Sequence, residues 1–178
     1  MNPLDGKTEM SLPSEFLIQE LESTITDANR GLPEDVFLFV SRVTPLVNVD
    51  LLIRDDRGRT LMTWRNDRYS NPGWHIPGGI IRFKEAARER ILATALAELK
   101  AEVEFDPAPL AINEIIHPTR DERGHSISLL YRCRLLSCLP AGRRFRPTRP
   151  RRDAWKWHDC CPENMVPAQA IYRPFFSA

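Results

Sequence analysis

The stretch PGWHIPGGIIRFKEAARERILATALAELKA, residues 72–101, decides the fold. Gly and Pro end regular structure, so we expect turns at 71–73 and 77–79 on either side of a short strand at 74–76. The segment 85–99 has no Gly or Pro and is rich in Ala, Arg, Glu and Leu, which favour a helix. Its expected apolar face consists of Ile91, Leu92, Ala95, Leu96 and Leu99. The stretch therefore predicts a strand, a glycine turn and a helix that begins directly after it.

The sequence on both sides of this stretch predicts a mixed sheet. Before it, residues 44–53 (TPLVNVDLLI) and 60–64 are expected as strands joined by a turn at 54–58. After it, further strands are expected at 110–116, 126–136 and 155–158, the second of them buried on both faces. The fold class that follows is α+β, with a mixed β-sheet sandwiched between α-helices.

Helices are expected at both ends of the chain. Apolar residues at helical spacing predict an amphipathic helix over 14–28 with Ser14 as its N-cap, and a second short helix from 33 to 40. A short terminal helix is expected from 162. We divide the chain into an N-terminal helical extension, residues 1–31, and a domain, residues 32–178.

The bulk composition indicates one globular core and excludes several classes of protein. Of 178 residues, 42% are hydrophobic and 28% charged, and the net charge of +1 argues against a nucleic-acid or membrane partner. No apolar run approaches membrane-spanning length and the N-terminus lacks a signal pattern, so we expect a cytoplasmic protein. The four cysteines lack zinc-finger spacing, and the adjacent Cys160 and Cys161 are awkward to bridge, so reduced thiols are expected.

The segment from Gly79 to Ala101 resembles the Nudix box, whose pattern is G-x5-E-x7-R-E-U-x-E-E-x-G-U with U aliphatic. Gly79, Glu85 and Glu98 match this pattern. The positions that depart from it are Ala93, Thr94, Ala97 and Lys100, which stand where the family has Arg, Glu, Glu and Gly.

Segments outside the box extend the resemblance to about residues 32–160. TPLVNVDLLI, DDRGRTLMTWR, PGWHIPGG and LLYRCRL occur in the order and at the spacings of the Nudix hydrolase family. Together with LPEDVFLFVSRVTPLV, Asp50 and Arg65, they resemble the GDP-mannose mannosyl hydrolase branch, which itself uses a modified box. The resemblance implies the Nudix fold and a metal-dependent hydrolase of nucleoside-diphosphate sugars.

The resemblance also implies a metal site with Mg²⁺ or Mn²⁺ held by the Gly78 carbonyl and the Glu98 carboxylate. Mg²⁺ takes oxygen ligands and usually only one or two carboxylates besides water and substrate phosphates. In the branch, water displaces the nucleoside diphosphate at the anomeric carbon of the sugar, and the metal stabilises the departing diphosphate. The missing carboxylates at 94 and 97 argue against attack at phosphorus with several metals. The alternative is that Glu98 is an ordinary exposed helix residue.

Three residues are expected to be catalytic. The positions matching Asp50 and Arg65 contribute to catalysis in the branch. Asp50 would touch the sugar or the water, and Arg65 would neutralise the leaving group through bidentate phosphate contacts. His117 lies near the sugar-side loop in the matching pattern and suits proton transfer near neutral pH. The alternatives are a strand-end aspartate, a surface arginine and a surface histidine.

Five further residues are expected to bind substrate: Arg82, His125, Arg151, Arg152 and Trp155. Arg82 is close in sequence to the glycine turn, His125 belongs to the sugar-side loop, and Trp155 would stack on a base. The branch's Gln metal ligand and His base align with Arg151 and Arg152, and a guanidinium neither binds Mg²⁺ nor acts as a base. These two arginines end the segment 142–152 (GRRFRPTRPRR), expected either as a phosphate-binding loop or as a solvated irregular loop.

Two functions therefore stay open. One is metal-dependent hydrolysis of nucleotide sugars, and the other is a catalytically degenerate Nudix domain that binds a nucleotide or phosphorylated ligand without turnover. RNA binding through the arginine loop has thin support, because only Phe145 and Trp155 interleave the basic residues. The N-terminal helices and the branch resemblance predict a homodimer. We expect His75 to be structural and assign no role to His158.

Overall fold

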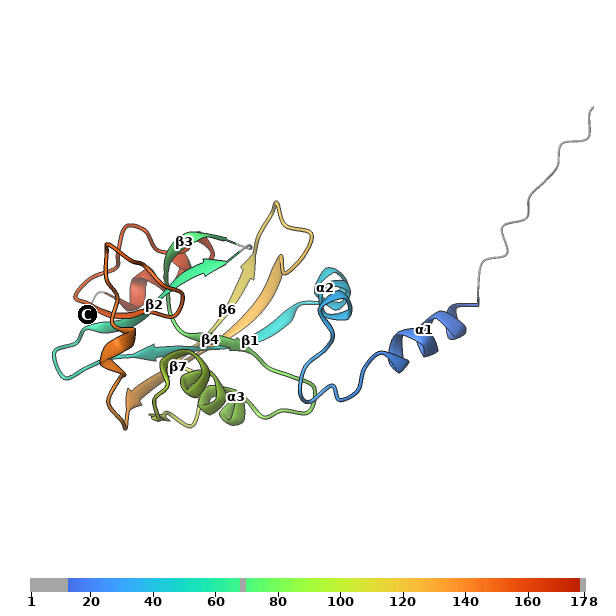
Figure 1. Cartoon of the computed structure of the whole chain (residues 1–178), viewed down its shortest axis with the longest axis horizontal. Helices are drawn as coiled ribbons and strands as arrows, with labels where there is room; N and C mark the ends of the chain where they lie inside the picture. The colour runs from blue at the N-terminus through green and yellow to red at the C-terminus, as the bar shows by residue number, and fades with distance from the viewer. Residues whose placement is uncertain (1–12, 68–69, 177–178) are drawn as a thin grey trace, which may run out of the picture.

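Two β-sheets form the centre of the molecule (Figure 1). The structure is a computed structural model that describes residues 13–67 and 70–176. The strands of the first sheet are β1 (Leu46–Ile53), β4 (Gly78–Ile80), β5 (Val103–Phe105), β6 (Ala111–Ile116) and β7 (His125–Leu135). This sheet is mixed and has the order β4-β1-β7-β5, and β6 also pairs with β7. The second is antiparallel and has the order β3-β2-β8; its strands are β2 (Thr60–Asp67), β3 (Ser70–His75) and β8 (Trp155–His158).

Strand β1 lies at the centre because it is apolar on both faces. Val49, Leu51 and Ile53 pack in one core cluster with residues of the central helix, whereas Leu52 packs in a second cluster with Tyr172. Successive side chains of a strand point to opposite faces, so Asp50 shares the face of Leu52. Strand β1 thus lies between two apolar clusters and carries a buried acidic residue, Asp50, on the face of the second cluster.

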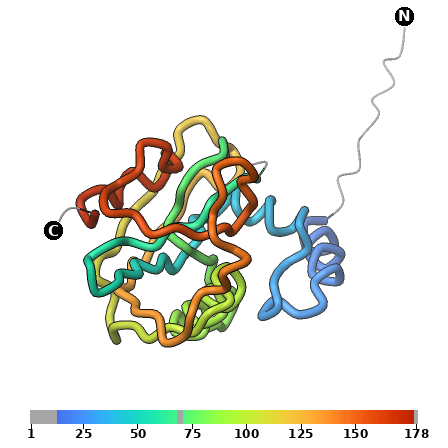
Figure 2. Tube along the Cα trace, turned by 60° about the vertical axis from the view of Figure 1, so that its left-hand side comes forward, coloured from blue at the N-terminus to red at the C-terminus, as the bar shows by residue number. Residues whose placement is uncertain are grey.

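The helices surround these sheets unequally. α3 (Ala87–Thr94) continues as a π-helical segment, η1 (Ala95–Leu99), and packs on β1 and β4. α1 (Ser14–Ser23) buries no residue and lies apart from the sheets (Figures 1 and 2), while α2 (Glu34–Val43) buries Val36 and Ser41. Two 3-10 segments follow, η2 (Ala141–Arg143) and η3 (Pro167–Phe175). No helix within 13–67 and 70–176 is both long enough and apolar enough to cross a membrane.

The α+β class is confirmed, but several expected boundaries were wrong. The first helix ends at Ser23 rather than 28, and Pro13 rather than Ser14 is its N-cap. The expected terminal helix begins at 167 and is 3-10. Strand β5 was not predicted because it has only three residues. Residues 1–12 of the N-terminal extension lie outside the described residues.

Two differences concern the segment that decides the fold. The expected glycine turn at 77–79 contains strand β4, because Gly78 and Gly79 pair with Asp50 and Val49 of β1. The expected helical face was too wide: Ile91, Ala95 and Leu99 are buried, but Leu92 and Leu96 are exposed. Only the narrow i, i+4 stripe of the helix meets the sheet.

Candidate functional site

A polar cavity of about 250 Å³ lies among residues of both sheets, η1 and the loop before β8. Five of the predicted site residues line it: Asp50, Arg65, Gly78, Glu98 and Arg152. The loop between β6 and β7 contributes Arg123, and the loop before β8 contributes Asp153. We call this space the polar cavity.

Glu98 is the acidic residue of η1 and lies against the edge of strand β4. The backbone N–H of Gly78 donates to its carboxylate, and the hydroxyl of Thr63 donates to Oε2 at 3.4 Å. Burial raises the pKa of Glu98 to about 8, and the negative charges of Asp153 and Asp50 add to the effect. A cation bound among these carboxylates would relieve the same repulsion.

The carbonyl of Gly78 belongs to the outer edge of the mixed sheet. The N–H of Leu51 donates to the Pro77 carbonyl at 2.9 Å, and the N–H of Ile81 donates to the Val47 carbonyl at 2.8 Å. Along an antiparallel pair, residues whose N–H and C=O groups bond to the partner strand alternate with residues whose groups point away from it. The N–H and C=O of Gly78 therefore face away from β1. Since the Gly78 N–H reaches Glu98, the Gly78 carbonyl lies on the edge that Glu98 occupies.

The residues present fit one divalent cation. Glu98 supplies a carboxylate, the edge of β4 supplies a carbonyl, and both donors are oxygens, as Mg²⁺ requires. No cluster of three or more His, Cys, Asp or Glu side chains with metal-binding geometry occurs in the part of the chain that the structure describes. An ion held by Glu98 and the Gly78 carbonyl would complete its shell with water and substrate oxygens.

Asp50 is buried and already hydrogen-bonded. Its Oδ2 accepts from the hydroxyls of Ser128 at 2.5 Å and Tyr172 at 2.7 Å. Burial raises its pKa, although these two hydrogen bonds and the charge of Arg65 oppose that shift. Its other oxygen lies against Gly78. One oxygen of Asp50 is therefore held by two hydroxyls, and the other lies beside β4 in a residue that lines the polar cavity.

Strand β2 places the side chain of Arg65 at the polar cavity. Its Nε donates to Asp67 Oδ2 at 2.6 Å, and the side chain is mostly buried. Such a pair holds the planar guanidinium in one orientation, which favours bidentate binding of a phosphate.

His75 also lines the polar cavity. Its Nε2 lies 3.0 Å from Thr63 Oγ1, so it shares with Glu98 a contact to the same hydroxyl. Burial lowers its pKa to about 3, and Arg65 contributes to the shift. The ring is therefore neutral across the physiological range.

The neutral ring of His75 predicts a loss of stability in mild acid. Between pH 6.5 and 3 the unfolded chain binds a proton at His75 that the folded chain does not, so the contribution of His75 to stability falls as pH falls, by up to about 1.4 kcal/mol per pH unit. Glu98, whose pKa burial raises to about 8, contributes with the opposite sign above pH 4.5, so the effect of His75 is the difference between the wild-type and variant slopes. We expect His75→Gln to reduce this slope between pH 6.5 and 5, measured by urea unfolding at several pH values. Above pH 7 the slopes of the two proteins should agree. If the slope of stability against pH below 6.5 were the same in His75→Gln as in the wild type, His75 would not be neutral in the folded protein. Part of the slope will persist in the variant, because burial also lowers the pKa of His158, to about 4.

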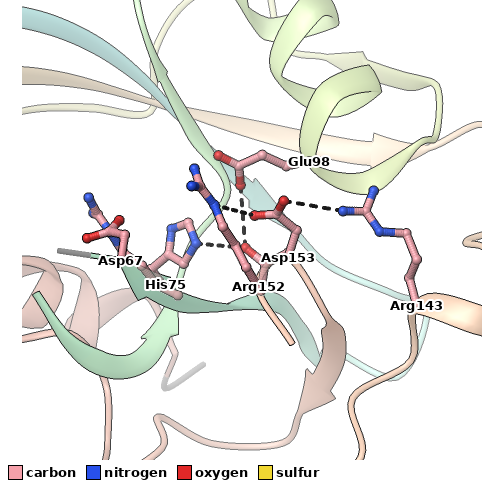
Figure 3. Close-up of polar contacts among 8 residues, drawn as sticks. Asp67, His75, Glu98, Arg143, Arg152 and Asp153 are labelled. Atoms are coloured by element: carbon pink, nitrogen blue, oxygen red, sulfur yellow. Dashed lines mark hydrogen bonds and ion pairs between the residues drawn. The ribbon is translucent and has the colours of Figure 1, made fainter. Parts of the chain in front are cut away.

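Several residues that line the cavity were not among the predicted site residues, including Asp67, Arg123, Asp153 and Gln169. Asp153 lies between Arg143 at 3.3 Å and Arg152 at 3.6 Å (Figure 3). Asp153 is the single acidic residue within 142–154, and this contrast with its basic neighbours could have marked it as a site residue in the sequence. Gln169 holds the turn before β4, because its side chain accepts from the Ile76 N–H at 2.6 Å and donates to the Ile76 carbonyl at 3.3 Å. Nothing in the local sequence marks that contact.

Five predicted site residues do not line the polar cavity. His117 and His125 lie at the β6–β7 loop, where the His125 ring contacts Glu114 at 3.1 Å. Arg82 lines an apolar groove beside α2, and Arg151 lines a separate cavity among arginines. Trp155 packs against the core and donates its indole N–H to the Pro140 carbonyl at 2.9 Å, so its ring is engaged in the fold.

Glu85 has a structural partner within the box-like segment. Arg90 binds it with two hydrogen bonds of 2.6 and 2.8 Å, and these contacts lower the pKa of Glu85 despite partial burial. Arg90 lies one turn before Ala93, the position where the box has Arg. This ion pair joins the loop after β4 to α3 and leaves Glu98 as the box carboxylate that faces the cavity.

The cavity with its carboxylate and arginine side chains thus lies between a mixed sheet and a helix that follows a Gly-Gly strand. The chain belongs to the NUDIX domain family, whose model matches residues 44–171. The predicted Nudix fold and the membership of the Nudix family are confirmed. Divalent metals such as Mg²⁺ are general to Nudix hydrolases.

Individual relatives are more distant. The low-salt glycan biosynthesis protein Agl8 of Haloferax volcanii is 29% identical over 93 residues, which are 52% of this chain and 58% of the relative. The MutT NUDIX hydrolase from Burkholderia pseudomallei has a TM-score of 0.56 and 23% identity, covering 74% of this chain and 97% of that one. The MutT protein from Methanosarcina mazei Go1 has a TM-score of 0.53 and 18% identity, covering 75% and 91%. These structural similarities show the fold alone.

Proposed function

We propose that the protein hydrolyses a nucleoside-diphosphate sugar with the help of one divalent cation, Mg²⁺ or Mn²⁺, as in the GDP-mannose mannosyl hydrolase branch. The observation that carries this proposal is the placement of Glu98 against the edge of β4, in the cavity that Asp153 and Arg65 also line. The name of the archaeal relative, which refers to glycan biosynthesis, supports a substrate that contains a sugar.

Charge neutralisation by a single cation suits departure of a diphosphate better than activation of water by several metals. When bound, the cation supplies a positive charge next to the diphosphate oxygens. Glu98 and the Gly78 carbonyl would hold it there. Arg65, oriented by Asp67, binds the same phosphates with its remaining N–H groups. Arg152 lines the cavity and adds a second guanidinium.

A carboxylate is also needed to orient the attacking water. Asp50 accepts two hydrogen bonds at Oδ2 and its Oδ1 lies against Gly78, so we propose that it positions β4; its catalytic role stays a prediction. Asp153 is the carboxylate proposed to orient the water and take its proton, because it lines the cavity near Glu98 and is held by two arginines. His117 stays a prediction for proton transfer.

A second candidate function is ligand binding without turnover. It is favoured by Thr94, whose hydroxyl is buried without a hydrogen-bond partner and lies against Gly79. The box pattern has Glu at this position, so one carboxylate of the usual set is replaced by a small packed side chain. This candidate predicts nucleotide binding that does not require a metal.

One experiment separates these functions. The full chain is incubated with a panel of GDP- and UDP-sugars and Mg²⁺ or Mn²⁺ in ¹⁸O-labelled water, and products are identified by mass spectrometry. We expect labelled free sugar and unlabelled nucleoside diphosphate, because the C1–O bond breaks and the sugar takes the water oxygen. Label in a nucleoside monophosphate or a sugar phosphate would show attack at phosphorus instead. No turnover, with metal-independent binding by calorimetry, would favour the second candidate.

A further inference from the structure

Six arginines surround a second cavity, of about 220 Å³, beside the polar cavity. They are Arg143, Arg144, Arg146, Arg149, Arg151 and Arg152. We infer that this arginine cavity is a binding site for a phosphate group, separate from the place where the diphosphate is cleaved. Guanidinium groups present several N–H donors in a fixed plane that matches phosphate oxygens, so a convergent set of them favours a doubly charged phosphate over a carboxylate.

The loop that carries these arginines is anchored at both ends. Phe145 packs against both Trp64 and Trp74, with ring centroids at 5.1 and 4.5 Å, and its N–H donates to the Trp155 carbonyl at 2.9 Å. At the other end, Ala154 is buried and its carbonyl accepts from the Trp64 N–H at 2.8 Å. An anchored loop holds its side chains near one another, in contrast to a solvated charge run.

The charges inside the arginine cavity are not balanced by the loop itself. Asp153 is the only carboxylate in the loop segment 142–154, and it pairs with Arg143 and Arg152. Arg144 lies 6.0 Å from the ring of Trp155, which provides a cation–π contact but no counter-charge. Several like charges around one space repel one another, and a bound anion removes that repulsion.

A buried nitrogen of Arg143 adds a second, independent observation. Its Nη1 is enclosed and has no hydrogen-bond partner among the residues that the structure describes, although its Nη2 binds Asp153. Buried donors are almost always paired in folded proteins, and an unpaired one is costly. Arg143 lines the arginine cavity, and an acceptor oxygen that reached this nitrogen from a bound ligand would satisfy it.

Arg152 connects the two cavities, because it lines both of them. A substrate whose diphosphate lies in the polar cavity can therefore place a further phosphate among the arginines. This extension rests on the proposed function, whereas the phosphate site itself does not. The same chemistry is offered by free inorganic phosphate, so the experiment must distinguish an attached phosphate from a free one.

The test uses the full chain in EDTA, so that its outcome is independent of metal and turnover. Calorimetry measures binding of inorganic phosphate, GDP, GTP and 3′-phosphorylated GDP to the wild type and to the double variant Arg146→Gln/Arg149→Gln. A matched control, Arg57→Gln/Arg88→Gln, removes the same charge from exposed arginines elsewhere on the domain. We expect phosphate affinity to fall at least tenfold in the first variant and to be unchanged in the control.

The nucleotides identify the source of the phosphate. If the cavity takes an attached phosphate, GTP or 3′-phosphorylated GDP binds the wild type more tightly than GDP, and the loop variant loses that advantage. If it takes free phosphate, only the phosphate affinity changes. The inference is overturned if the wild type does not bind phosphate at millimolar concentration, or if the control variant loses as much affinity as the loop variant. Failure of the sugar-nucleotide assay with intact phosphate binding would reject the proposed function alone.

Discussion

Glu98→Gln is expected to lower metal-dependent turnover about 100-fold or more, which corresponds to roughly 2.7 kcal/mol of lost transition-state stabilisation. The amide oxygen can still accept from the Gly78 N–H and from Thr63, so the local structure should persist. What is lost is the negative charge that holds a cation beside the diphosphate. Turnover is measured with the substrate identified in the labelled-water experiment, and Mn²⁺ binding by paramagnetic resonance.

The stability of the same variant separates a catalytic role from a structural one. Burial raises the pKa of Glu98 to about 8 from an ordinary value of 4.5. Between these values the folded chain binds a proton that the unfolded chain releases, so stability falls as pH rises, by up to about 1.4 kcal/mol per pH unit. Glu98→Gln removes that loss, and we expect the variant to be at least as stable as the wild type at pH 8 without metal.

The exposed Glu102 offers a matched control close to η1. Glu102→Gln removes one carboxylate near the end of the same segment and should leave turnover, Mn²⁺ affinity and stability unchanged. Equal loss of turnover in both variants, or full Mn²⁺ affinity in Glu98→Gln, would contradict the cation site. Unfolding of Glu98→Gln at pH 8 would show instead that the carboxylate is needed for the fold.

The parts of the fold that could be predicted are those with a local signal. The strand at 46–53 and the helix around 91–99 follow from runs of apolar residues and from the absence of Gly and Pro. Strand β4 could not be predicted, because Gly78 and Gly79 have no strand preference and are held by pairing with a distant strand. The width of the buried helix face likewise depends on how the helix meets the sheet.

The residues of the polar cavity also divide into those with a local sequence signal and those placed by contacts between distant segments. Glu98 and Gly78 were predicted from spacing within one segment, and the structure brings both to the polar cavity. Asp153 reaches Glu98 only through the loop before β8, which the sequence analysis expected to be irregular. Trp155 was expected at the substrate because of its residue type, but its indole N–H binds the Pro140 carbonyl. Contacts between distant segments decide such positions, and a single sequence does not contain them.

Gly78→Ala is expected to destabilise the fold by about 3 kcal/mol, an effect at the upper end for overpacking a buried position. The backbone of Gly78 does not need a positive φ, so the cause is space rather than conformation. An added Cβ would overlap Asp50 Oδ1 and lie 3.2 Å from the Val49 carbonyl. Asp50 cannot move aside easily, because Ser128 and Tyr172 hold its other oxygen.

Urea unfolding measures this loss against two controls. Gly142→Ala adds the same methyl group where nothing lies within 4 Å, and its effect should stay within about 0.5 kcal/mol. Asp50→Ser shortens the obstructing side chain, so the double variant Gly78→Ala/Asp50→Ser should lose less stability than the sum of the two single changes. Strict additivity would mean that Asp50 does not press on β4. If the double variant loses less stability than the sum of the single changes, Asp50 sets the position of the strand edge at which Glu98 and the Gly78 carbonyl meet.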